Sequence, residues 1–313
     1  MKALLPLLFL FAACAGPAPE VSGGPCSLDR RAVLPVAVVQ NVPLVGVVIN
    51  GRPATMVLDT GADLTMLTQT AARRLGLVPE EGVSISTVSA GGEGVAGFAR
   101  IDGLLLGEAA SPGRLVGVAP ISLPRWDGRP LDGLLGTDVL GEYDVELDLP
   151  NATVTLYRAR PCPGALPPWP EPFQVLERRD VLPGTLFVPA WLDGVGLTAL
   201  LDTGTSLTVV TPRVAWAAGV TAEVLARAPV LRSVTSGPNG LLTRAVRFRE
   251  LRLGEEALHG PVLLVAPLPP SAGDALLGGE YLASRRVWLS FATGQVFVAR
   301  PRPRPEVHIH PAR

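Results

Sequence analysis

The sequence contains few charged residues of either sign, and this scarcity argues against one class of function. Only 18% of the 313 residues are charged, and the formal net charge at pH 7 is −1. Proteins that bind nucleic acids gather Lys and Arg on one face or segment, so we expect no nucleic-acid partner. Hydrophobic residues make up 48% of the chain, which is enough to build cores and excludes disorder throughout.

Long hydrophobic runs are absent after residue 16. A membrane-spanning helix needs about 20 consecutive apolar residues, so we expect none there despite a mean hydropathy of +0.35. The chain holds 34 Gly and 32 Pro, and these residues favour turns between short strands over long helices. The composition predicts a water-soluble, mainly β protein.

Histidine and cysteine occur only three times each, and their placement does not indicate a metal or nucleophile site. His259 has no neighbouring ligand types, and His308 and His310 lie in a Pro-rich tail, residues 301–313, expected to be disordered. No Ser/His/Asp or Cys/His grouping and no Gly-rich phosphate loop is evident. We therefore expect neither a metal nor a cofactor.

The N-terminus holds the one distinctive apolar run. Met1–Lys2 precede residues 3–13, a stretch too short to span a membrane and typical of a signal peptide, predicted over residues 1–13. A Gly/Pro-rich tether is expected over residues 14–31. Small residues before Cys14 resemble a bacterial lipobox. This implies an exported lipoprotein that faces the periplasm or cell exterior and contacts the membrane only through lipid on Cys14. The alternative is an ordinary signal peptide cut near Ala15 or Gly16.

Two cysteines remain, Cys26 and Cys162. An even number in an exported chain predicts one disulfide, with two free thiols as the alternative.

An internal repeat organises the rest of the chain. The segment Val42–Val78 aligns without a gap on Thr185–Thr221, and Asp-Thr-Gly occurs in both at matching places. A second pair of segments, 131–140 and 274–282, shares Leu-Leu-Gly at a nearly constant distance from each Asp-Thr-Gly. The repeat predicts two similar lobes, residues 32–159 and 179–300, joined by a Pro-rich linker over residues 160–178.

Each lobe is expected to consist of hairpins. Asn50–Gly51 and Asp193–Gly194 are favoured hairpin turns between apolar runs. Short helices are expected at 70–75 and 212–218, closing hairpins at 145–149 with 153–157 and at 287–291 with 295–299, and packed tryptophans at Trp126, Trp191 and Trp288.

The duplicated motifs resemble the two lobes of an aspartic peptidase of the retropepsin/pepsin-like superfamily. The motifs are Val57–Ala62 with Leu134–Gly136 in the first lobe, and Leu200–Thr205 with Leu276–Gly278 in the second. The resemblance covers residues 32 to about 300, with lobes of retropepsin size, as in a bacterial aspartyl protease lipoprotein. It implies a mainly all-β fold of two homologous acid-protease-like β-barrel lobes with short helices and an active-site cleft between them.

The resemblance also implies the chemistry. Asp59 and Asp202 would be the catalytic pair of an aspartic endopeptidase, activating a water to attack a peptide bond. Two adjacent carboxylates cannot both ionise, so they share a proton, and one serves as base while the other serves as acid. The substrate would be an extended peptide, and the protein a monomer whose lobes form an intramolecular pseudo-dimer.

The residues around each aspartate have implied roles as well. They form three matched pairs: Gly61 with Gly204, Thr60 with Thr203, and Ala62 with Thr205. The glycines permit a tight turn, and the threonines exchange hydrogen bonds between the lobes. The Thr205 hydroxyl can donate to Asp202, but Ala62 has no donor for Asp59, so the pair should be asymmetric.

A flap is expected over the site. The hairpin tip Ala90, Gly91, Gly92 and Glu93 is the candidate flap, and it lacks the tyrosine of pepsin-like flaps. Ser236–Gly240, at the matching place in the second lobe, is either a smaller flap or a turn. Cys26 and Cys162 would staple the ends of the first lobe.

Other interpretations were weighed against this one. The two lobes could hold peptides or a partner with negligible catalysis, or could be an inherited scaffold in a structural lipoprotein. A phosphatase-type site at Asp202 lacks the further Asp or Lys that such sites need. Asp63 is expected to be a turn or helix cap and not a third catalytic acid, and Asp138 and Glu280 are expected to be surface or cap residues.

Overall fold

The computed structural model describes residues 28–159, 166–177, 184–233, 240–291 and 293–301. The predictions for the signal peptide, Cys14, Cys26, Cys162, most of the Ser236–Gly240 loop, and the tail with His308 and His310 concern residues outside these ranges. Within these ranges, no helix is long and apolar enough to cross a membrane.

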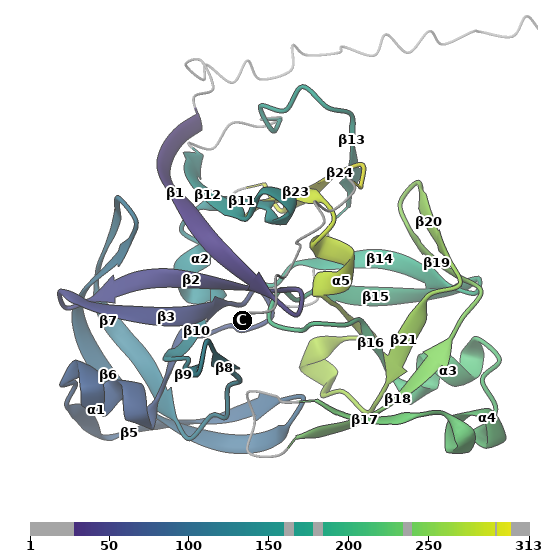
Figure 1. The fold of residues 1–313 in the computed structure, drawn as a ribbon, viewed down its shortest axis with the longest axis horizontal. Helices are drawn as coiled ribbons and strands as arrows, with labels where there is room; N and C mark the ends of the chain where they lie inside the picture. Colours follow the sequence, from purple (N-terminus) through teal and green to yellow (C-terminus); the bar gives the residue numbers. More distant parts are fainter. Residues whose placement is uncertain (1–27, 160–165, 178–183, 234–239, 292, 302–313) are drawn as a thin grey trace, which may run out of the picture.

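The first lobe is built almost entirely of strands with two short helices (Figure 1). Its elements are β1 (Leu28–Val39), β2 (Val42–Ile49), β3 (Arg52–Leu58), β4 (Met66–Thr68), α1 (Gln69–Leu75), β5 (Pro79–Ser89), β6 (Gly92–Leu106), β7 (Ala109–Ala119), β8 (Arg125–Trp126), β9 (Arg129–Pro130), β10 (Gly133–Leu135), α2 (Thr137–Leu140), β11 (Asp144–Asp148), η1 (Leu149–Asn151) and β12 (Thr153–Ala159).

The second lobe repeats most of this order. Its elements are β13 (Phe173–Leu176), β14 (Phe187–Leu192), β15 (Val195–Leu201), β16 (Val209–Val210), α3 (Pro212–Ala217), α4 (Ala222–Arg227), β17 (Val230–Ser233), β18 (Leu241–Arg247), β19 (Glu250–Leu253), β20 (Glu256–His259), β21 (Val262–Val265), η2 (Pro270–Ala272), β22 (Ala275–Leu277), α5 (Gly279–Leu282), β23 (Arg286–Ser290) and β24 (Gln295–Ala299).

The predicted mainly β, two-lobed fold is confirmed. In the first lobe β10 pairs in parallel with β3 and antiparallel with β4, and β4 pairs in parallel with β7. In the second lobe β22 pairs in the same way with β15 and β16, and β16 pairs in parallel with β21. The two sequence motifs of each lobe therefore lie on adjacent strands.

Local chemistry explains why these hairpins form where the sequence predicted them. Asn50 adopts a φ of 49° and Gly51 a φ of 76°, the left-handed conformations that a tight hairpin turn needs. The Asn50 side-chain oxygen also accepts the amides of Asp102 and Gly103, 2.8 and 3.2 Å away. Asp193 is the corresponding acceptor in the second lobe, because its carboxylate accepts the backbone amides of residues 249 and 250.

A sheet formed by both lobes lies above them in Figure 1. Its strand order is β13-β24-β23-β11-β12-β1, so the closing hairpin of one lobe pairs with that of the other. We call it the interlobe sheet. Trp169, Trp288 and Phe297 form an apolar cluster on it. Strand β13 falls within the stretch expected to be a linker, because Phe173–Leu176 pairs with β24.

The tryptophans divide between core and surface. Trp288 is 2% exposed, as predicted. Trp126 and Trp191, which were also expected to be packing residues, are 38% and 37% exposed. Trp126 lies on β8, in a small hairpin with β9 that stands apart from the two large sheets.

The turn between β1 and β2 extends from the first lobe onto the second. The Asn41 side-chain nitrogen donates to the carbonyl of Ser206 at 3.2 Å. A Cβ at Gly279 would lie 2.0 Å from the Asn41 carbonyl oxygen, so only glycine fits at this point of α5. The first lobe has Thr137 at the corresponding place, and the repeat is broken where the lobes meet.

Candidate active site

Asp59 and Asp202 occupy matching positions immediately after β3 and β15. The Asp59 amide donates to the carbonyl of Leu135 on β10 at 3.0 Å, and the Asp202 amide donates to Leu277 on β22 at 3.1 Å. Each aspartate is thus fixed by the Leu-Leu-Gly strand of its own lobe. Both residues are buried, with exposed fractions of 9% and 7%.

The two aspartates face each other across the lobe boundary. A Cβ built on Gly61 would lie 2.6 Å from Cγ of Asp202, and one built on Gly204 would lie 2.5 Å from Cγ of Asp59. The glycine of each lobe therefore lets the other lobe's carboxylate approach, and any side chain there would displace it. Each glycine amide also donates to the aspartate of its own lobe, at 2.9 and 2.8 Å.

Thr60 and Thr203 join the lobes directly beneath the aspartates. The Thr60 hydroxyl donates to the carbonyl of Leu201 at 2.7 Å and accepts the amide of Thr203 at 3.1 Å. The Thr203 hydroxyl donates to the carbonyl of Leu58 at 2.6 Å and accepts the amide of Thr60 at 3.0 Å. These four bonds are buried and fix the residues that adjoin both aspartates.

The electrostatics of the two aspartates differ. Burial raises the pKa of Asp59 well above its ordinary value, and the neighbouring Asp202 carboxylate raises it further. Burial also raises the pKa of Asp202, but hydrogen bonds from the Thr205 hydroxyl and the Gly204 amide lower it. Ala62 offers Asp59 no hydroxyl. The pKa of Asp59 is therefore raised more strongly than that of Asp202.

The candidate flap is the hairpin of β5 and β6. These strands pair from Ser84 opposite Gly97 to Ser89 opposite Gly92. The Ser89 hydroxyl oxygen accepts the amide of Gly91 at 3.1 Å and so shapes the tip. Ala90, at the tip, packs against an apolar cluster of the second lobe that includes Phe187 and Leu200. The tip of a first-lobe hairpin thus touches the opposite lobe, whereas Glu93 points to solvent.

A family model for aspartyl proteases matches the chain twice, over residues 45–139 and 188–281, which is more than half of its length. The chain belongs to the aspartyl protease family. Each match includes one Asp-Thr-Gly and its Leu-Leu-Gly partner, so the family pattern is present once per lobe.

A solved structure supports the fold of this aspartyl protease. The aspartic proteinase from Irpex lacteus is similar over 86% of this chain and 97% of its own chain, with a TM-score of 0.55 and 14% sequence identity. No match was found among curated protein sequences.

Asp138 and Glu280, which were expected at the surface or at caps, accept hydrogen bonds from the loops that follow the two Asp-Thr-Gly turns. The Asp138 carboxylate accepts the amide and the hydroxyl of Thr65, both at 2.7 Å, and the Thr65 hydroxyl oxygen accepts the amide of Gly136 at 3.0 Å. Burial raises the pKa of Asp138 above its ordinary value. Asp138 therefore links the turn after Asp59 to the end of β10.

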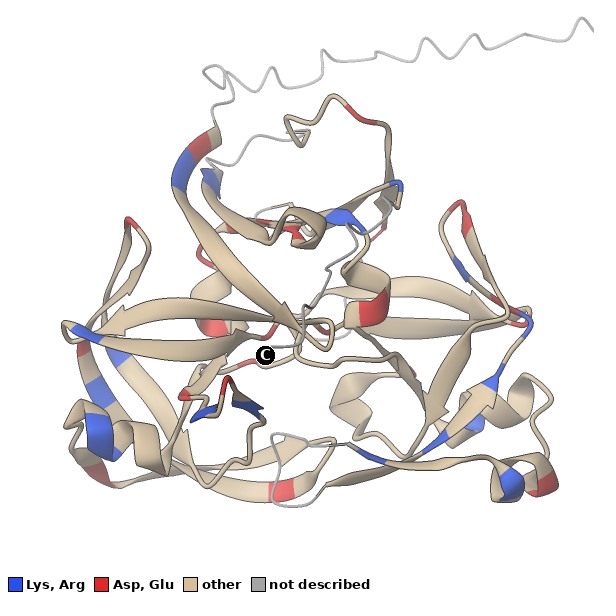
Figure 2. Ribbon diagram, viewed as in Figure 1, with Lys and Arg blue, Asp and Glu red and all other residues tan. Residues whose placement is uncertain are grey.

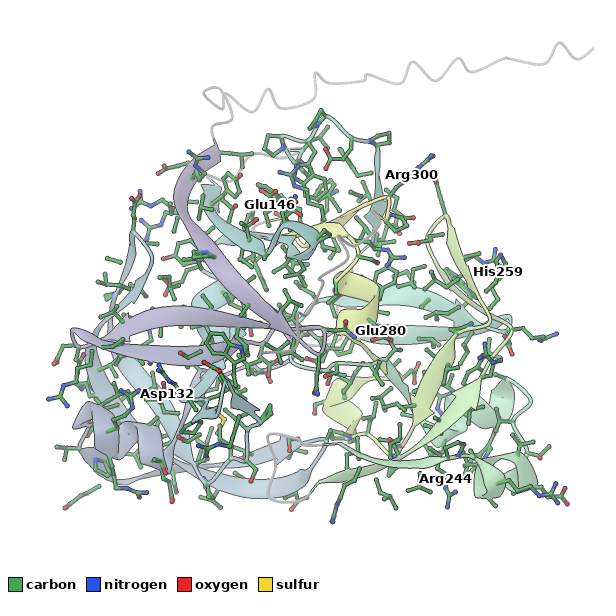
Figure 3. The ribbon with its side chains drawn as sticks, viewed as in Figure 1. Asp132, Glu146, Arg244, His259, Glu280 and Arg300 are labelled. Atoms are coloured by element: carbon green, nitrogen blue, oxygen red, sulfur yellow. The ribbon has the colours of Figure 1, made fainter. Side chains whose placement is uncertain are left out.

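Glu280 occupies the corresponding place in the second lobe (Figure 3). Its carboxylate accepts the amide of Thr208 at 2.6 Å, and the Thr208 hydroxyl oxygen accepts the amide of Gly278 at 3.1 Å. Burial raises the pKa of Glu280. An acidic residue two positions after Leu-Leu-Gly in both lobes was the sequence signal for this role.

Replacing Asp138 by alanine should destabilise the protein by about 1–3 kcal/mol, because the buried Thr65 amide and hydroxyl lose their acceptor. Asp138→Asn keeps an oxygen acceptor and should retain most of the stability. Urea unfolding of both variants measures the difference. Equal stabilities of Asp138→Ala and the wild type would show that the bonds to Thr65 contribute nothing.

Proposed function

We propose that this protein is an aspartic endopeptidase in which Asp59 and Asp202, one carboxylate from each lobe, activate the attacking water. The observation that carries the proposal is the approach of these two buried carboxylates, each lying against the glycine of the opposite Asp-Thr-Gly. Family membership supports the same reaction.

The asymmetry of the pair assigns the two roles. Asp202, ionised, accepts a proton from water as its oxygen attacks the peptide carbonyl carbon. Asp59, protonated, donates to the carbonyl oxygen, and a tetrahedral diol forms. The diol collapses as the C–N bond breaks: the departing nitrogen takes the proton now held by Asp202, and a hydroxyl of the diol returns a proton to Asp59. The acid and base are regenerated, so no cofactor enters the reaction.

The β5–β6 hairpin is proposed to close over an extended peptide. A backbone that lies beside such a hairpin can add to it by main-chain hydrogen bonds, while its side chains alternate between the two sides. The contact of Ala90 with the second lobe supports closure across the peptide. Closure would exclude bulk water from the reacting bond.

Digestion of an unstructured protein substrate tests the function. Purified protein should cleave casein between about pH 3 and pH 8, and a pepstatin-type inhibitor should block the cleavage. If the wild type cleaves nothing in this range but binds peptides, the protein is instead a peptide-binding module with two protease-like lobes.

The acidic limb of the pH–rate profile should depend on Thr205. Its hydroxyl lowers the pKa of Asp202, and this aspartate must be ionised for catalysis. Thr205→Ala removes the donor, so the pKa of Asp202 rises and activity is lost at a higher pH as the solution is acidified. Thr205→Ser keeps the donor and serves as the control. An acidic limb at the same pH in Thr205→Ala and the wild type would contradict this assignment.

We also propose that Cys26 and Cys162 form a disulfide. The ladder between β1 and β12 is described as far as Leu28 opposite Ala159. In the sequence Cys26 precedes Leu28 by two residues and Cys162 follows Ala159 by three. Mass spectrometry without reductant tests the bond.

Export and lipidation on Cys14 are part of the proposal as well, and labelled palmitate should mark the wild type but not Cys14→Ser.

A further inference from the structure

The two lobes differ most in one loop of the site. In the first lobe this loop follows Ala119, the last residue of β7, and in the second lobe it follows Ala266, the residue after β21. It leads to an aspartate, Asp132 or Asp274, that accepts a backbone amide of the neighbouring strand. The first-lobe loop has 12 residues (120–131), and the second-lobe loop has 7 (267–273). The additional residues form the β8–β9 hairpin.

The longer loop carries charge that the shorter one lacks. Arg125, Asp127 and Arg129 lie on the hairpin, whereas residues 267–273 include no charged residue. All three are exposed. Figure 2 shows the hairpin with blue strands and a red turn. Arg125 is engaged within the hairpin, since its guanidinium donates to the carbonyl of Gly128 at 3.0 Å.

Arg129 is differently placed. It lies directly opposite Trp126 in the hairpin register, so the two side chains share one face. Within the described ranges, the Arg129 side chain has neither a hydrogen bond nor an ion pair. The result is an exposed indole beside an unpaired guanidinium. Trp and Arg are the residue types that most often dominate the binding energy of protein interfaces.

The base of the hairpin packs on the part of the first lobe that surrounds Asp59. Ile121 and Leu123 before the hairpin, and Leu131 after it, belong to an apolar cluster that also contains Val57 and Ala62. Val57 precedes Asp59 by two residues, and alternate residues of a strand share a face. Arg129 is two residues from Leu131. At about 3.3 Å per residue, Arg129 lies within about 7 Å of Leu131 along the chain, and so near the cluster that contains Val57 and Ala62.

We propose that this face is a specificity element that selects peptides bearing an acidic side chain a few residues from the cleaved bond. The Arg129 guanidinium would pair with the substrate carboxylate. Trp126 would pack against the aliphatic part of the same substrate side chain. Because Asp132, directly after this loop, is held by the Thr55 amide at 2.8 Å and by Arg74 at 2.7 Å, the hairpin is presented from a fixed base. The proposal deepens the endopeptidase function and rests on it.

A peptide series tests the proposal. One cleavable sequence is prepared with Glu, Gln or Lys placed in turn at each of several positions on both sides of the cleaved bond. The wild type should prefer Glu over Lys by roughly three- to tenfold in kcat/KM at one of these positions. Arg129→Gln should bring this ratio close to one, and Arg129→Glu should invert it. Arg227→Gln, an equal change of charge at the exposed end of α4, should leave the ratio as in the wild type.

Binding of the same peptides to the Asp202→Asn variant is measured as well. These dissociation constants test the specificity element without requiring cleavage, so the two proposals can fail separately. If nothing is cleaved but Arg129-dependent binding of the Glu peptide is observed, the endopeptidase proposal fails and the specificity element stands. Equal rates and equal affinities for Glu, Gln and Lys at every position would overturn the specificity element. So would a preference for Glu that persists in Arg129→Glu.

Discussion

Replacing either Asp59 or Asp202 by asparagine is expected to lower kcat/KM by about 10²- to 10⁴-fold. The pair supplies both the base and the acid of the reaction, and general acid–base catalysis contributes about this much. Asparagine has almost the same shape, and its oxygen can still accept the glycine amide that donates to each aspartate. The loss should therefore come from chemistry and not from unfolding.

Three measurements make this expectation specific. Asp102→Asn, the same substitution at an exposed position on β6, should retain the wild-type rate. The asparagine variants should melt no lower than the wild type, because each replaces a carboxylate whose charged form is disfavoured by burial. They should still bind substrate peptides. Activity of Asp59→Asn within a few-fold of the wild type would remove Asp59 from the mechanism.

Replacing Thr203 by valine is expected to have the largest effect on stability, about 2–5 kcal/mol. The substitution preserves shape but leaves the carbonyl of Leu58 and the amide of Thr60 buried without a partner. An unpaired buried group costs about 1–3 kcal/mol. Because Leu58 directly precedes Asp59, the aspartates should also lose their alignment, and activity should fall even where the protein remains folded.

The matched control is Thr203→Ser, which keeps the hydroxyl and should retain both stability and activity. Urea unfolding gives the free energies, and kcat/KM is measured at a temperature well below every midpoint. If valine and serine at position 203 give the same stability, the hydrogen bonds between the lobes are not what holds the aspartates in place.

The sequence was most informative where structure depends on neighbouring residues. The turns at Asn50–Gly51 and Asp193–Gly194 need left-handed backbone and a side-chain acceptor, and both requirements are visible in a dipeptide. The pairing of Asp-Thr-Gly with Leu-Leu-Gly was readable only because the motifs occur twice. Helix α4 was missed because residues 222–227 bury no residue fully and so show no apolar pattern.

The role of a residue was not predictable where it depends on a contact partner that is distant in the sequence. Asp138 was interpreted as a surface or cap residue because its partner, Thr65, is 73 residues away. Trp126 was expected to be a packing residue, as tryptophan usually is, but it lies exposed on a hairpin that the repeat could not predict, since the second lobe lacks it. Both errors arose from judging a residue by its type without its tertiary partner.

The sequence by itself determined the two lobes, the hairpins and the pair of aspartates, because duplication placed the same local signals twice in one chain. The tertiary structure alone decided how the lobes meet. The closing hairpins join in one interlobe sheet, the Asn41 carbonyl needs a glycine at position 279, and each aspartate lies against the glycine of the opposite lobe's Asp-Thr-Gly. The physical reason is that each of these features is a contact between residues about 140 or more positions apart, or depends on one. No local pattern contains both partners.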